Sequence, residues 1–163
     1  LGEASSPDPA AWREPDFSDA LWSVGRGPFY YENTSGYTGN TMLPDMNGGY
    51  TCVFLRGTFQ LANPAAIREL TLTLQADDGC VVWLNGNRVR QVNMLDGEPS
   101  FDWPSLPAAG EPNVDTVVLT DPGTLLRTGT NGLAIQAFNA SLSGSTDFLI
   151  AAALLKPGDH VIV

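Results

Sequence analysis

The segment of residues 70–92 constrains the fold more than any other part of the chain. Leu70, Leu72 and Leu74 alternate with polar residues, which is the period of a half-buried strand. The Asp-Asp-Gly sequence at residues 77–79 then ends this strand, because Asp hydrogen-bonds its own backbone and Gly accepts a positive φ. We therefore expect a strand with one face in a hydrophobic core that stops at an acidic turn.

The second half of the same segment predicts a hairpin. Residues 80–84 form a short apolar run, and Asn85-Gly86 follows it directly. An Asn-Gly pair between alternating apolar residues favours a two-residue turn in which both residues have positive φ. Val89 and Val92 continue the apolar pattern on the far side, so residues 80–92 are expected to form two antiparallel strands.

Most of the remaining sequence also reads as short strands separated by turns. Strand patterns occur at residues 50–61, 114–119, 132–139 and 148–155. The 17 Gly and 12 Pro are spread along the chain, which suits many short strands joined by tight connections. We predict an all-β fold, an antiparallel β-sandwich or jelly roll.

The length of 163 residues is that of one domain. We expect residues 1–15 to be a lead-in or linker, residues 16–157 to form the sandwich, and residues 158–163 to be a C-terminal tail. No apolar run is long enough to cross a membrane as a helix. The chain begins without Met or a signal peptide, from which we expect a mature protein or an excised module.

The net charge of −10 restricts the partners of this chain. An acidic surface repels phosphate backbones and anionic membranes, so neither a nucleic acid nor a membrane is an expected partner. Acidic polysaccharides are disfavoured for the same reason, whereas neutral sugars carry no such penalty.

The residue inventory also argues against catalysis. His160, the only His, is the fourth residue from the end of the chain, so a His-activated nucleophile is not expected. A zinc site would need several His or Cys. A glycosidase needs paired carboxylates, but the predicted strands at 50–61, 70–76, 80–84 and 132–139 contain none. We predict no catalytic residues, and a small polysaccharide lyase or glycosidase is the weaker alternative.

The acidic turn has two interpretations. Asp77 and Asp78 could ligate Ca²⁺ through their carboxylate oxygens, or they could simply satisfy turn amides. Asp-rich turns are common, so we favour the second interpretation and assign no metal ligands. A structural Ca²⁺ is the one cofactor that this turn would allow.

Aromatic residues in long loops supply candidates for sugar binding. The faces of sugar rings stack on Trp and Tyr, while polar side chains take the hydroxyl groups. Trp103 in a polar loop is the best candidate for an exposed stacking platform, and Tyr37 is second. On chemistry alone, Asn139, Arg90 and Asp78 are the candidate polar partners.

A set of short segments in a fixed order carries a family resemblance. These segments are 17–22 (FSDALW), 41–46 (TMLPDM), 50–59 (YTCVFLRGTF), 77–86 (DDGCVVWLNG), 92–94 (VNM), 129–136 (GTNGLAIQ), 139–143 (NASLS) and 147–148 (DF). Together they resemble a galactose-binding-like β-sandwich module found in secreted multidomain proteins of planctomycetes and related bacteria. The Asp-Asp-Gly turn alone also resembles lectin-type sandwiches that bind sugar through Ca²⁺.

The resemblance implies a secreted, non-catalytic accessory domain that binds carbohydrate, with neighbouring domains of its parent protein as further partners. The same group also contains protein-binding and structural members, so a domain that packs against a catalytic neighbour is the alternative. The sequence departs from the family pattern at residues 32–40, which are usually richer in Asp.

Cys52 and Cys80 are the only cysteines, and they also depart from the family pattern. Taken alone, the pair leaves two buried thiols and a disulfide both open. A bridge would close a loop of about 28 residues and stabilise the fold by about 3 kcal/mol. Because we expect a secreted protein, we predict that the bridge forms.

Overall fold

The computed structural model of the protein describes residues 8–32, 36–103, 105–106 and 112–157. The expected tail at 158–163, with His160, lies outside these residues, as do residues 1–7. The strands of the described part are β1 (Phe29–Glu32), β2 (Thr41–Met42), β3 (Cys52–Leu61), β4 (Glu69–Asp77), β5 (Gly79–Leu84), β6 (Asn87–Val92), β7 (Asn113–Thr120), β8 (Gly129–Phe138) and β9 (Asp147–Leu155). Short 3₁₀ turns occur at η2 (Ala11–Arg13), η3 (Pro64–Ala66) and η4 (Pro122–Thr124). No helix in these residues is long and apolar enough to cross a membrane.

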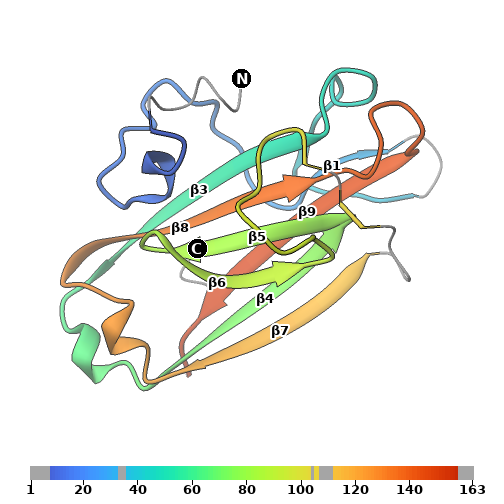
Figure 1. Cartoon of the computed structure of the whole chain (residues 1–163). Coiled ribbons are helices and arrows are strands. Elements are labelled where there is room, and N and C mark those ends of the chain that lie inside the picture. Colours follow the sequence, from blue (N-terminus) through green and yellow to red (C-terminus); the bar gives the residue numbers. More distant parts are fainter. Residues whose placement is uncertain (1–7, 33–35, 104, 107–111, 158–163) are drawn as a thin grey trace.

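The strands form two facing sheets (Figure 1). The five-stranded sheet has the order β2-β1-β9-β4-β7, and the four-stranded sheet has the order β3-β8-β5-β6. All neighbours are antiparallel except β1 and β2, which are parallel. The predicted β-sandwich is therefore confirmed. β1 and β2 lie in a Gly-rich segment for which the sequence predicts no strand.

The predicted hairpin is β5–β6. Asn85 and Gly86 form its turn with φ values of 49° and 76°, the positive angles that an Asn-Gly turn favours. The turn is also tied to β8, because Asn85 Nδ2 donates to Asn131 Oδ1 at 2.7 Å and Gly132 N donates to Asn85 Oδ1 at 2.8 Å. These bonds fix the hairpin against its neighbouring strand.

The main core lies between the two sheets and follows the predicted alternation. Leu70, Leu72 and Leu74 of β4 are buried there, opposite Val82 and Leu84 of β5. The whole of β5 is buried because its other face is covered as well. On that face Trp83 belongs to a second apolar cluster, whose buried members are Trp12, Val81, Trp83, Met94, Ala134 and Phe138.

Part of the segment 1–15, which we expect to be a lead-in or linker, belongs to this outer cluster. Trp12 is 1% exposed and packs edge-on against Trp83, with ring centroids 5.5 Å apart. Arg13 is also buried, and its guanidinium lies 4.0 Å from the centroid of the Trp83 ring. The N-terminal segment, blue in Figure 1, thus covers the outer face of the four-stranded sheet. Sequence periodicity could not reveal this contact, because the segment is irregular.

Trp12 should therefore contribute strongly to stability. We expect Trp12→Ala to lower the free energy of unfolding by about 3–5 kcal/mol, because it leaves a large cavity against Trp83. Leu21→Ala, a change at a fully exposed residue of the same segment, should change it by less than about 0.5 kcal/mol. Urea denaturation of both variants would measure the difference. Equal effects would contradict the role assigned to Trp12.

The Asp-Asp-Gly sequence is not a turn between paired strands. β4 belongs to the five-stranded sheet and β5 to the four-stranded sheet, so Asp78 carries the chain from one sheet to the other. Asp77 ends β4, and both carboxylates are buried instead of facing solvent. The predicted end of the strand is therefore confirmed, whereas the burial of both acids is not evident from the sequence. The two acids lie inside one end of the sandwich.

The predicted Cys52–Cys80 disulfide is also wrong, since both thiols are free. Cys52 lies opposite Phe138 and Cys80 lies opposite Ala137, which are neighbouring residues of β8. Because successive residues of a strand point to opposite faces, the two cysteine side chains point to opposite faces of the sheet. Moreover, β8 separates β3 from β5, which places their backbones about 9–10 Å apart. A disulfide needs Cα atoms within about 7 Å, so the pair cannot bridge.

Both thiols should be unreactive in the folded protein. Burial raises the pKa of Cys52 and of Cys80 to about 12, so each stays protonated at pH 8, where thiol reagents attack thiolates. We expect neither thiol to react with a disulfide reagent in native protein, and both to react in denaturant without reductant. A count of fewer than two reactive thiols in denaturant would contradict the free cysteines and support the predicted disulfide.

Candidate functional site

The candidate site lies at the end of the sandwich where β4 passes into β5, β8 ends and β9 begins (Figure 1). Asp78 N donates to the carbonyl of Phe138 at 3.1 Å, and Asp78 Oδ2 accepts from Ala140 N at 2.5 Å. These two bonds hold the Asp78 carboxylate beside the backbone of Asn139. Two of the predicted site residues, Asp78 and Asn139, are thus brought together by the fold.

The Asn139 side chain is held by a tyrosine that the sequence did not single out. Asn139 Nδ2 donates to Tyr31 Oη at 2.8 Å, and Tyr31 Oη donates to the carbonyl of Ser145 at 3.2 Å. Asn139 is 2% exposed, and its Oδ1 has no hydrogen-bond partner. A buried amide oxygen normally finds a donor or a cation, so this oxygen marks a place for a ligand atom.

The backbone around Asp78 is equally well fixed. Asn93 Nδ2 and Asn113 Nδ2 both donate to the carbonyl of Asp78, each at 3.1 Å. Asn93 lies just after β6 and Asn113 begins β7, so these bonds tie both sheets to the crossing. The position of the Asp78 carboxylate is therefore set by the fold and does not depend on a loose loop.

One loop at this end presents uncharged polar side chains. The segment 140–146 contains Ser141, Ser143 and Thr146, and Gly48 N donates to the carbonyl of Leu142 at 2.6 Å. That bond joins the 140–146 loop to the 42–50 loop. The 42–50 loop adds the exposed carboxylate of Asp45, which accepts from Tyr50 Oη at 2.8 Å.

The oxygens of this centre fit a hard cation such as Ca²⁺, which binds about six to eight oxygens. Within the described residues no group of three or more His, Cys, Asp or Glu could hold a metal ion. A calcium ion at this end would have the Asp78 carboxylate and Asn139 Oδ1 as its candidate side-chain ligands. The buried and unpartnered Asn139 Oδ1 supports this fit.

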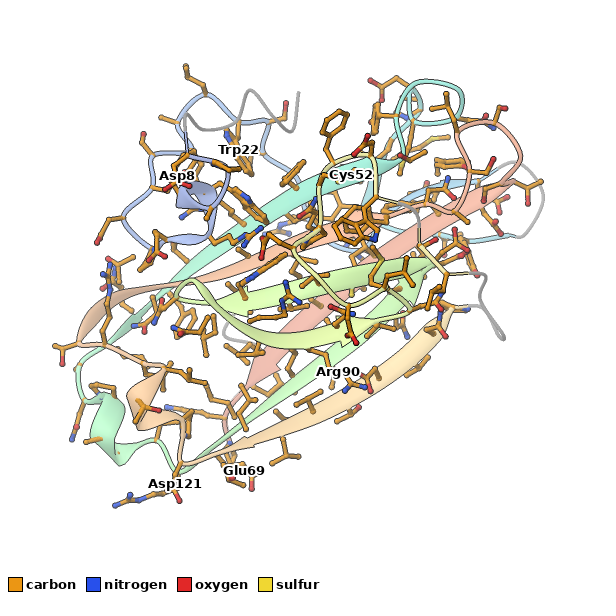
Figure 2. All side chains as sticks on the ribbon, viewed as in Figure 1. Asp8, Trp22, Cys52, Glu69, Arg90 and Asp121 are labelled. Atoms are coloured by element: carbon orange, nitrogen blue, oxygen red, sulfur yellow. The ribbon has the colours of Figure 1, made fainter. Side chains whose placement is uncertain are left out.

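Arg90 does not belong to this centre. Its Nε and Nη2 donate to the two carboxylate oxygens of Asp115, at 2.5 and 3.1 Å. Arg90 lies opposite Val82 and Asp115 opposite Leu74, so both start from core-facing positions of the two edge strands β6 and β7. The ion pair closes that edge of the sandwich, near the Arg90 label in Figure 2. Arg90 has a structural role.

Trp103 and Tyr37 are half-buried, in contrast to the predicted exposed platforms. Trp103 packs against the outer cluster, and a Cβ added at Gly97 would lie 2.8 Å from its ring. Tyr37 lies beyond β1, where its backbone N donates to Glu32 Oε2 at 3.0 Å. Trp103 thus belongs to the outer face of the four-stranded sheet.

Comparisons with known proteins concern the fold. No family model and no curated protein matches the chain. A calcium-binding mutant of Bacteroides uniformis beta-glucuronidase 2 is similar with a TM-score of 0.50 and 17% identity, over 88% of this chain and 16% of that chain. A PA14 sugar-binding domain from an RTX adhesin is similar with a TM-score of 0.43 and 19% identity, over 68% of this chain and 48% of that chain. A family 35 carbohydrate-binding module from an environmental isolate is similar with a TM-score of 0.42 and 14% identity, over 84% of this chain and 86% of that chain.

Proposed function

We propose that this chain is a non-catalytic carbohydrate-binding module, an accessory domain of a secreted multidomain protein, and that it binds neutral sugar at the Asp78–Asn139 end. The observation that carries the proposal is the buried Asn139 Oδ1, which has no hydrogen-bond partner and precedes Ala140, whose N donates to the Asp78 carboxylate. Amide and carboxylate oxygens in one fixed cluster can hold a cation or accept from hydroxyl groups.

Burial decides how these residues would act. Asp78 is 4% exposed and Asn139 is 2% exposed, so they would hold the ion and fix the loops, while the loops make most of the sugar contacts. Ca²⁺ held there would supply coordination sites for sugar hydroxyls. The hydroxyls of Ser141, Ser143 and Thr146 would bond to the same ligand, and Trp103 or Tyr37 would add at most a partial stacking surface.

The same burial supports the absence of catalysis. A glycosidase places one carboxylic acid against the glycosidic oxygen and a second carboxylate on the other side of the bond. Asp77 and Asp78 are adjacent in the chain and both buried, so neither is placed to reach a scissile bond. The net charge of −10 favours an uncharged ligand.

A glycan array probed with and without Ca²⁺ tests this function. We expect binding to neutral glycans in the presence of Ca²⁺, loss of binding after chelation, and no binding to sulfated or uronic-acid glycans. A rise in melting temperature with Ca²⁺ would report ion binding independently of sugar. Failure to bind any glycan in either condition would refute the proposal.

The second candidate function is a structural domain that packs against a neighbouring catalytic domain. One observation favours it: Val114 and Val118 on the outer face of the five-stranded sheet are exposed, unlike the covered outer face of the other sheet. A chain that ignores all glycans but binds a flanking domain of its parent protein would support this candidate.

A further inference from the structure

A cavity of about 410 Å³ enters the sandwich at the edge where β1 and β3 face each other. Its walls come from core side chains of both sheets. These include Leu55, Leu133 and Ile135 from the four-stranded sheet and Ile150 and Ala152 from the five-stranded sheet. This volume falls within the range of about 300–1,000 Å³ that is usual for small-molecule sites. The cavity is separate from the Asp78–Asn139 end.

Two features of the strands leave this space open. β1 pairs with β9 only as far as Ile150, so the rest of β9 has no strand beside it on that edge. Gly57 and Ala152 line the space, and both lack a side chain large enough to fill it. β3 keeps an unbroken register with β8 through Gly57, which pairs with Leu133, so this glycine is not a bulge. Because Gly57 has no side chain, it leaves space in the cavity.

The outer wall of the cavity, residues 19–27, is anchored on both sides. Asp19 Oδ2 accepts from Arg56 Nη1 at 2.5 Å, and Trp22 packs on Phe17 with ring centroids 5.8 Å apart. At the other side Arg26 N donates to Thr41 Oγ1 at 2.8 Å, and that hydroxyl donates back to the Arg26 carbonyl at 2.8 Å. The wall therefore cannot simply collapse into the space, and the cavity is preformed.

The lining specifies the chemistry of an occupant. Arg56 and Asp19 are the charged residues of the lining and neutralise each other, and Arg56 also donates to the carbonyls of Trp12, Glu14 and Phe17. A charged ligand would therefore find no free counter-charge. At the mouth, Val24 and the nearby Leu21 are fully exposed, at 101% and 100%. Apolar residues beside an apolar cavity are typical of a binding site.

We propose that this cavity binds a small uncharged apolar molecule, an aromatic ring or a short alkyl chain, independently of any sugar. The ligand would insert between Gly57 and Ala152 and bury apolar surface that now faces solvent. The site would be present in the isolated chain because both anchors of residues 19–27 belong to the chain itself.

Cyclohexanol is a suitable uncharged probe, and cyclohexanecarboxylate and cyclohexylammonium are the charged probes of similar shape. In a ¹⁵N NMR titration we expect saturable shifts at Gly57, Ile135 and Ala152 with a Kd of about 1 mM, which is typical for so small a ligand. Both charged probes should bind at least about tenfold more weakly, because their charge would be desolvated without a partner. Resonances of Asp78 and Asn139 should not move.

Ala152→Leu and Ala153→Leu form a matched pair, because neighbouring residues of β9 point to opposite faces. Ala152→Leu should fill the cavity and abolish the cyclohexanol shifts, while Ala153→Leu should leave them unchanged. If Ala152→Leu does not fold, xenon applied to the unaltered protein must still shift the same resonances. Absence of saturable shifts with both cyclohexanol and xenon, or undiminished binding by Ala152→Leu, would overturn the proposal.

Discussion

Asp78→Asn is expected to abolish calcium-dependent sugar binding while the protein stays folded. The amide has the shape of the carboxylate, so the bond from Ala140 N can persist, but the negative charge that a cation requires is lost. We expect the affinity for Ca²⁺ to fall at least about tenfold, with a matching loss of glycan binding. Calorimetric titration with Ca²⁺ and then with the glycan found on the array would measure both.

Asp121→Asn is the matched control for this change. Asp121 is exposed at the far end of the sandwich, where it pairs with Arg68 at 3.6 Å, and its label in Figure 2 lies far from the start of β9. We expect this variant to bind Ca²⁺ and sugar as the unaltered chain does. Full binding by Asp78→Asn, or an equal loss in Asp121→Asn, would contradict the assigned site.

Arg56→Met is expected to lower stability by an amount comparable with that of Trp12→Ala. The Arg56 side chain is 3% exposed, and its guanidinium donates to the carbonyls of Trp12, Glu14 and Phe17 and pairs with Asp19. Removing it leaves these acceptors without their donor and releases the segment that covers Trp83. We expect the free energy of unfolding to fall by about 3 kcal/mol or more.

Arg68→Met provides the control, because Arg68 is an arginine of the same chain whose side chain is 81% exposed. Its single ion pair lies in solvent, so the change should cost less than about 0.5 kcal/mol. Chemical denaturation of both variants would compare them directly. A loss below about 1 kcal/mol for Arg56→Met would show that the N-terminal segment is held mainly by Trp12 and not by this arginine.

The sequence predicted those parts of the fold that depend on local patterns. The alternation of Leu70, Leu72 and Leu74 identified a buried face, and Asn85-Gly86 identified the hairpin turn. These signals are local because side-chain direction in a strand and φ in a tight turn are set by neighbouring residues. They do not say which strands share a sheet, so the sequence alone does not reveal that Asp78 carries the chain from one sheet to the other.

The candidate site was predicted only in part for the same reason. Asp78 and Asn139 were chosen for their chemistry, and the fold joins them through bonds across 62 residues of sequence. Tyr31, which holds Asn139, lies in a strand too short to show a period. Arg90 and Trp103 have equally suitable chemistry, but tertiary contacts commit Arg90 to an ion pair and Trp103 to packing.

The order of strands has a consequence for how this chain folds. β8 lies between β3 and β5, and β9 lies between β1 and β4, so the last two strands to be synthesised are interior strands of the two sheets. Neither sheet can be completed until residues 129–155 have left the ribosome, and β4, which can pair earlier with β7, must wait for β9, its second partner, about 80 residues further along. The earlier strands would expose unpaired edges in the meantime, so folding is expected to be slow and to follow synthesis of the whole domain.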